Sequence, residues 1–124
     1  MTRERGESVG FDAILEPLLA APGAIAAAFV DAQGQSIATA GDALALEVIG
    51  AYQPIWTAGL AGAAARGGLG ELAELEMDFE ERRILVAVVP DRYFLVVLFE
   101  RSGVPSVAMA RLAVARERLS VEIG

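Results

Sequence analysis

The feature that most constrains this chain is residues 42–68, a long segment that is apolar on nearly every side of a helix. Asp42 offers an N-cap side chain and Gly67-Gly68 offer a stop, so the segment predicts one helix with a bend at Pro54. At about 100° per residue, its large side chains fall in two stripes on opposite sides. The first stripe comprises Leu44, Val48, Ala51, Tyr52 and Ile55, and the second comprises Leu46, Ile49, Trp56 and Leu60.

Two stripes on one helix indicate that both of its sides are covered. The protein's own sheet covers one stripe, and a chain of 124 residues has little left to cover the other. We therefore expect a second copy of the chain to cover the second stripe, which makes this helix both core and dimer interface. The alternative is that loops and terminal helices cover it within one chain. Three polar residues of the helix are the predicted contacts for a further partner protein: Glu47, Gln53 and Thr57.

The composition removes several classes of function. The chain is 55% hydrophobic, which excludes disorder, and its net charge of -7 without a basic run argues against nucleic acid. It contains no Cys, His, Lys or Asn. Thiolate and imidazole nucleophiles, bases and metal ligands are therefore missing, as is the lysine of a Walker A motif. We expect a protein that is not an enzyme and that uses no cofactor or metal.

The length predicts a single domain over residues 1–124, with residues 1–8 as a polar, flexible start. That start is charged and no apolar stretch of the signal-peptide kind follows it. The apolar runs at 84–90 and 93–99 are too short to span a membrane. The expected location is the cytoplasm, without membrane insertion.

The remaining elements follow from hydrophobic periodicity and turn residues. Besides the long helix, the expected helices cover 9–20, where Pro17 should kink or divide the helix, and 105–121. The expected strands cover 24–30, 35–40, 73–80, 83–89 and 93–99. The order is α-β-β-α-β-β-β-α.

Two of these strands place the layers. Residues 83–89 and 93–99 are apolar on both faces, so they must lie centrally in an antiparallel sheet that is covered on both sides. Residues 73–80 instead alternate between a dry face and an acidic face. The predicted fold is α+β with three layers: a five-stranded antiparallel sheet, the long helix on one face and the two terminal helices on the other.

Two stretches of this pattern resemble the Roadblock / dynein light chain family. Residues 22–41, PGAIAAAFVDAQGQSIATAG, are similar to its Pro-Gly, apolar strand, Asp-x-x-Gly hairpin and second strand. Residues 93–119 are similar to its last strand, short loop and closing helix. The resemblance covers nearly the whole chain, and profilin-like and longin-like domains have related topologies.

The resemblance implies a homodimer formed through the long helix and the neighbouring edge strand, often as a continuous ten-stranded sheet. It adds Leu75 and Met77 of that strand to the predicted interface. It also implies a non-enzymatic regulator or scaffold of small Ras-like GTPases. Two rival functions stay open: a sensor domain in which abundant Ala and Gly leave an apolar pocket for a small molecule, and a purely architectural dimer in a larger complex.

The acidic row Glu74, Glu76, Asp78 and Glu80 has two interpretations. Its carboxylates are hard-cation ligands, but alternate residues of one strand stand about 6–7 Å apart and form a poor cage. A solvated face, or a charged edge that limits further sheet pairing, is the favoured interpretation. The glycine-rich residues 59–70 lack the Lys of a phosphate loop and are interpreted as a helix end.

Overall fold

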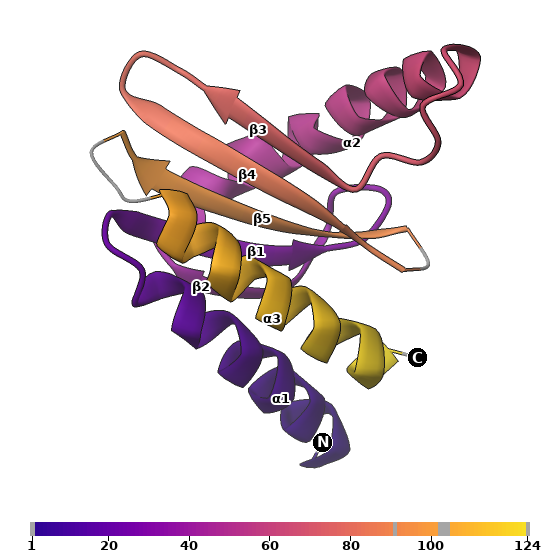
Figure 1. Ribbon diagram of the computed structural model, residues 1–124. Coiled ribbons are helices and arrows are strands. Elements are labelled where there is room, and N and C mark those ends of the chain that lie inside the picture. Colours follow the sequence, from indigo (N-terminus) through magenta and orange to yellow (C-terminus); the bar gives the residue numbers. More distant parts are fainter. Residues whose placement is uncertain (1, 91, 102–104, 124) are drawn as a thin grey trace.

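The computed structural model describes the backbone of residues 2–90, 92–101 and 105–123, and their side chains except those of 2–9, 43, 47–54, 105 and 123. Its five strands form one antiparallel sheet in the order β2-β1-β5-β4-β3. The sheet is sandwiched between helices, with α1 and α3 side by side on one face and α2 on the other (Figure 1). The elements are α1 (Thr2–Leu19), β1 (Ala24–Val30), β2 (Ser36–Gly41), α2 (Ala43–Arg66), β3 (Glu74–Asp78), β4 (Arg82–Val89), β5 (Tyr93–Glu100) and α3 (Pro105–Ile123).

The predicted order and the three layers are confirmed, with one large difference in the bounds of an element. Helix α1 begins at Thr2 rather than near residue 9. Pro17 lies within α1 without dividing it, two residues before the helix ends at Leu19. The predicted division of the helix at Pro17 therefore does not occur.

The central position of β4 and β5 is also confirmed, because their alternate residues enter two separate cores. One core lies under α1 and α3; it contains Phe29, Leu85, Val97 and Phe99 from the sheet, and Leu15, Leu18, Leu112 and Leu119 from the helices. The other lies under α2 and contains Val30, Ile84, Val86, Val96 and Leu98 from the sheet. From α2 it receives only Leu46 as a fully buried side chain of the described residues. The two faces of the sheet are therefore covered unequally.

The unequal cover follows from the path of α2. The helix begins at the end of β2, where the Asp42 side chain accepts a 3.3 Å hydrogen bond from the Ala45 amide as the predicted N-cap. It packs mainly against β1 and β2. Its C-terminal half then passes behind the sheet and extends beyond it (Figure 1), and Gly67 ends it as predicted. The sheet surface on the β3 side is left without a full helical cover.

Among the described residues, none of the helices is long and apolar enough to cross a membrane.

Candidate protein-interaction surface

The outward side of α2 carries large apolar side chains that the described residues leave exposed. Leu44 is 74% exposed and Ile55 is 66% exposed. They are eleven residues apart, about three helical turns, and therefore lie on one line along the helix. Gly59 follows on the same side, and a Cβ built there would meet no atom within 4 Å. We call the surface formed by Leu44, Ile55 and Gly59 the outer face of α2.

This arrangement reverses the predicted assignment of the two stripes. Leu46, predicted at a dimer interface, is 3% exposed and belongs to the core under α2. Thr57, predicted as a contact for a partner protein, is 4% exposed and also faces inward. A side chain that its own chain has already removed from solvent is not accessible to a second one. Leu46 and Thr57 are therefore corrected from surface positions to buried ones.

The other predicted residues of α2 have different positions. Trp56 is half-buried on the flank of the helix, and Leu60 is exposed. Leu60 points to nearly the same side as Leu46, and it is exposed because the C-terminal half of α2 has left the sheet. The side chains of Ile49, Glu47 and Gln53 lie outside the described part of the structure.

Strand β3 supplies a second incompletely covered apolar surface. It forms one edge of the sheet and pairs only with β4 among the described strands. Leu75 and Met77 point to the α2 side, pack against the core there and remain half-buried. Phe79, directly after the strand, is exposed. The predicted dry face of β3 is thus apolar but only partly buried, since α2 packs mainly against β1 and β2.

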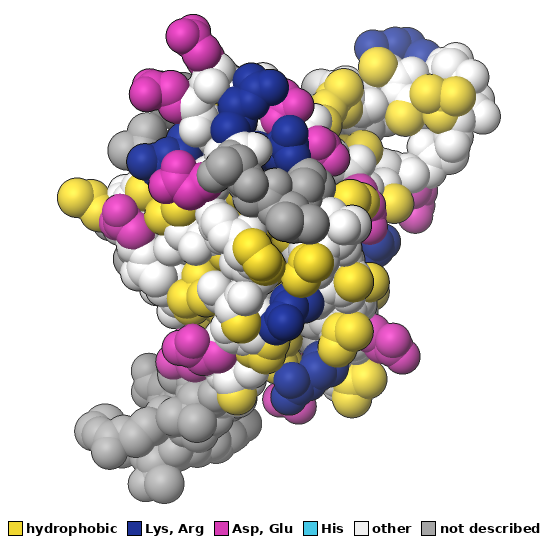
Figure 2. Space-filling view, turned by 60° about the vertical axis from the view of Figure 1, so that its left-hand side comes forward, with side chains coloured by type: hydrophobic (Ala, Val, Ile, Leu, Met, Phe, Trp, Pro, Cys, Tyr) yellow, Lys and Arg dark blue, Asp and Glu magenta, His cyan; other side chains and the backbone are white. Residues whose placement is uncertain are grey.

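A cleft of about 860 Å³ lies where α2 diverges from the sheet. One wall is the inner side of the C-terminal half of α2, with Ala61 and Ala65, and the other is the β4–β5 hairpin, with Val88 and Phe94. Glu71 and Arg92 are the charged residues that line it in the described part of the chain. In Figure 2 the end of α2 stands away from the body of the molecule as a lobe with hydrophobic side chains on its surface.

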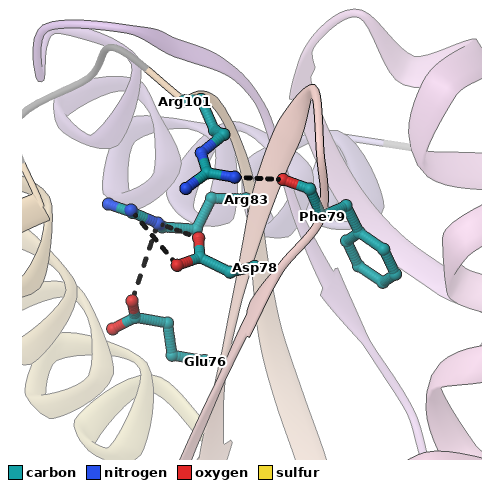
Figure 3. Close-up of polar contacts among 5 residues, drawn as sticks. All are labelled: Glu76, Asp78, Phe79, Arg83 and Arg101. Carbon is teal, nitrogen blue, oxygen red and sulfur yellow. Dashed lines mark hydrogen bonds and ion pairs between the residues drawn. The ribbon is translucent and has the colours of Figure 1, made fainter.

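The acidic side of β3 faces α3 and is matched by arginines. Arg83 of β4 forms ion pairs with both Asp78 and Glu76, and its guanidinium donates two hydrogen bonds to the Asp78 carboxylate (Figure 3). The hydrogen bonds from Arg83 lower the pKa of the Asp78 carboxyl below its usual value, and the charge of Arg83 lowers it further. Arg116 of α3 lies 3.4 Å from a Glu74 carboxylate oxygen. These contacts fit a charged edge, and no group of three or more potential metal ligands occurs among the described residues.

Arginine also fixes the turn at the end of β3. Arg101 Nη1 donates a 3.1 Å hydrogen bond to the Phe79 carbonyl oxygen, which ties the β3–β4 turn to the end of β5 (Figure 3). This hydrogen bond therefore fixes the backbone of Phe79, whose side chain is exposed. Apolar side chains with a fixed position are better suited to a binding surface than mobile ones, because less conformational entropy is lost on binding.

The structure brings together some predicted surface residues and adds others that the sequence analysis missed. Leu75 and Met77 lie on the same side of the sheet as α2, as the predicted interface requires. Leu44 and Ile55 were assigned to the sheet side, Phe79 was not anticipated as part of a surface, and the apolar pocket that the Ala and Gly content suggested was not given a position. The spacing of eleven residues between Leu44 and Ile55 was the signal that the two lie on one side of the helix. The cleft had no local signal, because its walls are far apart in the sequence.

Comparison with known proteins gives a consistent fold. No family model matches the sequence, and no curated protein matches it. Among solved structures, Myxococcus xanthus MglB has a TM-score of 0.83 at 21% identity, covering 91% of this chain and 94% of that one. A Roadblock/LC7 domain from Streptomyces avermitilis has a TM-score of 0.83 at 16% identity, covering 90% and 96%. The gliding protein mglB from Thermus thermophilus has a TM-score of 0.82 at 19% identity, covering 92% and 88%. At these identities the likeness shows the fold.

Proposed function

We propose that this chain, which has the fold of the Roadblock/LC7 domain, is a non-enzymatic homodimeric regulator or scaffold of a small Ras-like GTPase. The observation that carries the proposal is the outer face of α2, where Leu44 and Ile55 are exposed on a helix whose inner side is already buried. Covering a side chain of this size stabilises a complex by about 1.5–3 kcal/mol. A surface helix that needed no partner would present polar residues there.

In the proposed dimer, the two α2 helices lie against each other through their outer faces. Gly59 allows close approach, because it adds no side chain between the two backbones. Trp56, on the flank of the helix, Leu60, on its inner side beyond the sheet, and Leu75 and Met77 of β3 contribute at the margins, as the family resemblance implies. The free edge of β3 supports pairing with the partner copy. Because α2 extends beyond its own sheet, its C-terminal half can reach over the sheet of the partner.

The dimer is tested by placing a charge on the outer face. Ile55→Arg should halve the mass measured by sedimentation at micromolar concentration, since a guanidinium in an apolar interface must be desolvated without a counter-charge. Met109→Arg, at an exposed position of α3 on the other side of the sheet, is the matched control and should keep the mass of the unaltered protein. If Ile55→Arg also kept that mass and the same melting temperature, α2 would not be the dimer interface.

The GTPase partner is tested by the nucleotide state it prefers. The purified protein should retain the Ras-like GTPase encoded nearest to its own gene, with a difference between the forms loaded with GDP and with a non-hydrolysable GTP analogue. The Ile55→Arg variant should lose this retention together with the dimer. Equal retention of both forms would contradict regulation and favour the purely architectural dimer.

The cleft favours one alternative, a domain that binds a small apolar molecule. Its volume lies within the range of about 300–1,000 Å³ typical of ligand sites, and alanine side chains of α2 line one wall. A metabolite that raised the melting temperature at constant protein concentration would support this alternative. The rise should disappear in Ala61→Trp, which fills the cleft, and persist in Met109→Arg.

A further inference from the structure

A second apolar surface lies on the opposite face of the sheet, between α1 and α3. Two hollows of about 390 and 310 Å³ run along this groove, and both are lined by Ile14, Val114 and Arg118. Val114 stands between the hollows and is 59% exposed. Val121, also exposed, lines the hollow near the end of α3. Ala110 and Ala13 are small lining residues, so the sides of the groove stay low.

Two contacts join the helices, one toward each end of the groove. Near the start of α3, Arg111 Nη1 donates a 2.9 Å hydrogen bond to the Pro17 carbonyl oxygen of α1. Near its end, Glu122 lies close to Gly10 of α1. The helices therefore run antiparallel, as Figure 1 shows. Val114 forms a ridge midway along the groove.

Two of the charged residues around Val114 are placed symmetrically and have opposite sign, while Arg118 would lie opposite Ala110 of a symmetric copy. Arg111 precedes Val114 by three residues and Glu117 follows it by three. Three residues correspond to about 300° of rotation, so the two side chains flank Val114 at about 60° on either side. If an antiparallel copy of α3 lay across this face with a two-fold axis at Val114, each Arg111 would meet the Glu117 of the other copy. The contact would be self-complementary.

We propose that the α1–α3 groove binds a second copy of this chain, with α3 against α3 in antiparallel orientation about Val114. The Val114 side chains of the two copies meet at the axis, and the hollows of the groove lie on either side of them. A partner with only basic or only acidic groups would place a like charge opposite Arg111 or Glu117. A second copy places an opposite charge against each of them. This contact is independent of the outer face of α2, because it lies on the other side of the sheet.

Charge reversal tests the pairing with an internal rescue. Glu117→Arg places an arginine opposite each Arg111 of the pair, and Arg111→Glu places a glutamate opposite each Glu117. Each variant should weaken self-association roughly tenfold or more, because like charges meet twice across the axis. An equimolar mixture of the two variants should associate again as a mixed pair, since each Arg then meets a Glu. Met109→Arg is the control and should associate as the unaltered protein does.

The readout is mass by sedimentation across a concentration series, with melting temperature as the check that each variant is folded. Arg111→Glu also removes the hydrogen bond to Pro17, so Val114→Arg is a second disrupting variant that leaves that bond in place. Unchanged mass for Glu117→Arg and Val114→Arg would overturn the proposal, as would a mixture that stays dissociated.

The same measurements separate this proposal from the α2 dimer. Ile55→Arg reports on the outer face of α2, and Glu117→Arg reports on the groove. If only Ile55→Arg lowered the mass, the groove pairing would be refuted and the α2 dimer kept. If only Glu117→Arg lowered it, the reverse would hold. If Val114→Arg left the mass unchanged but abolished retention of the GTPase, the groove would bind the GTPase and the proposed occupant would be wrong.

Discussion

Gly41 is the residue where the backbone leaves the least room for a side chain. It has a φ of 80°, a left-handed conformation that non-glycine residues adopt at a cost. A Cβ at this position would lie 2.3 Å from the Ile25 carbonyl oxygen, which is backbone and cannot move aside. The turn matters because the next residue, Asp42, donates its amide to that same oxygen and caps α2.

Gly41→Ala should therefore lower the free energy of unfolding by roughly 2–3 kcal/mol or more, from backbone strain and the clash together. Gly59→Ala is the matched control: its Cβ meets nothing, and alanine stabilises a helix by about 0.5–1 kcal/mol over glycine. Urea unfolding of both variants at low protein concentration measures the difference. Equal stability of the two variants would contradict the left-handed turn at Gly41.

The charge of Asp78 makes the free energy of unfolding depend on pH in the acidic range. The hydrogen bonds from Arg83 lower its pKa in the folded protein, so folding favours the carboxylate. The resulting stabilisation is fully present above the ordinary carboxyl pKa of about 3.9 and is lost as the pH falls through the lower folded value.

Asp78→Asn should reduce stability slightly at neutral pH and make the loss of stability below about pH 4 shallower. The effect is small because the Asp78 side chain is about half-exposed to solvent. Melting temperatures from pH 7 down to pH 3 measure it, with Glu81→Gln in the β3–β4 turn as the control. A variant whose pH profile matched that of the unaltered protein would show that the contact with Arg83 does not act on folding.

At the scale of the elements, α2 shows where sequence reasoning succeeds and where it stops. Its bounds were predicted within a residue or two, because Asp42 and Gly67 give local signals at both ends. The buried side of the helix was predicted wrongly, because both sides are apolar and neither is preferred on hydrophobicity alone. The choice is made by the turn at Gly41 and Asp42, which is hydrogen-bonded to Ile25 and sets how the helix is rotated when it begins. That contact depends on the register of the β1–β2 hairpin, which hydrophobicity alone does not give.

The reversed assignment gives a direct test with two neighbouring leucines. Leu46→Ala should destabilise the protein by about 2–5 kcal/mol, as expected for a buried leucine. Leu44→Ala should change the stability of the isolated protomer by no more than about 0.5 kcal/mol, because Leu44 is exposed there. Chemical unfolding at a concentration below that of self-association makes the comparison. The opposite ranking would restore the original assignment of the stripes.

The strands show the same division between local and distant information. Strands β4 and β5 were placed centrally from their apolar faces alone, and the structure confirms this. Strand β3 was predicted to have one dry face, yet Leu75 and Met77 remain half-buried. Periodicity reports which side of a strand is apolar, whereas its cover depends on the direction in which α2 crosses the sheet.

At the scale of the whole molecule, the outer face of α2 and the α1–α3 groove lie on opposite sides of one sheet. Each proposed contact joins the same surface of two copies about a two-fold axis, so an assembly that uses both contacts contains more than two copies. If the two axes intersect at right angles, the assembly closes with four copies, and if they do not intersect it continues as a chain. Neither arrangement follows from the sequence, because both depend on how surfaces from distant segments are oriented.

Trp56, half-buried on the flank of α2 beside the outer face, is the single tryptophan of the chain. All indole fluorescence of the protein therefore originates from one position next to the proposed contact. Burial by a second copy should shift its emission to shorter wavelength upon concentration, without any attached dye. The protein thus carries its own optical probe of assembly.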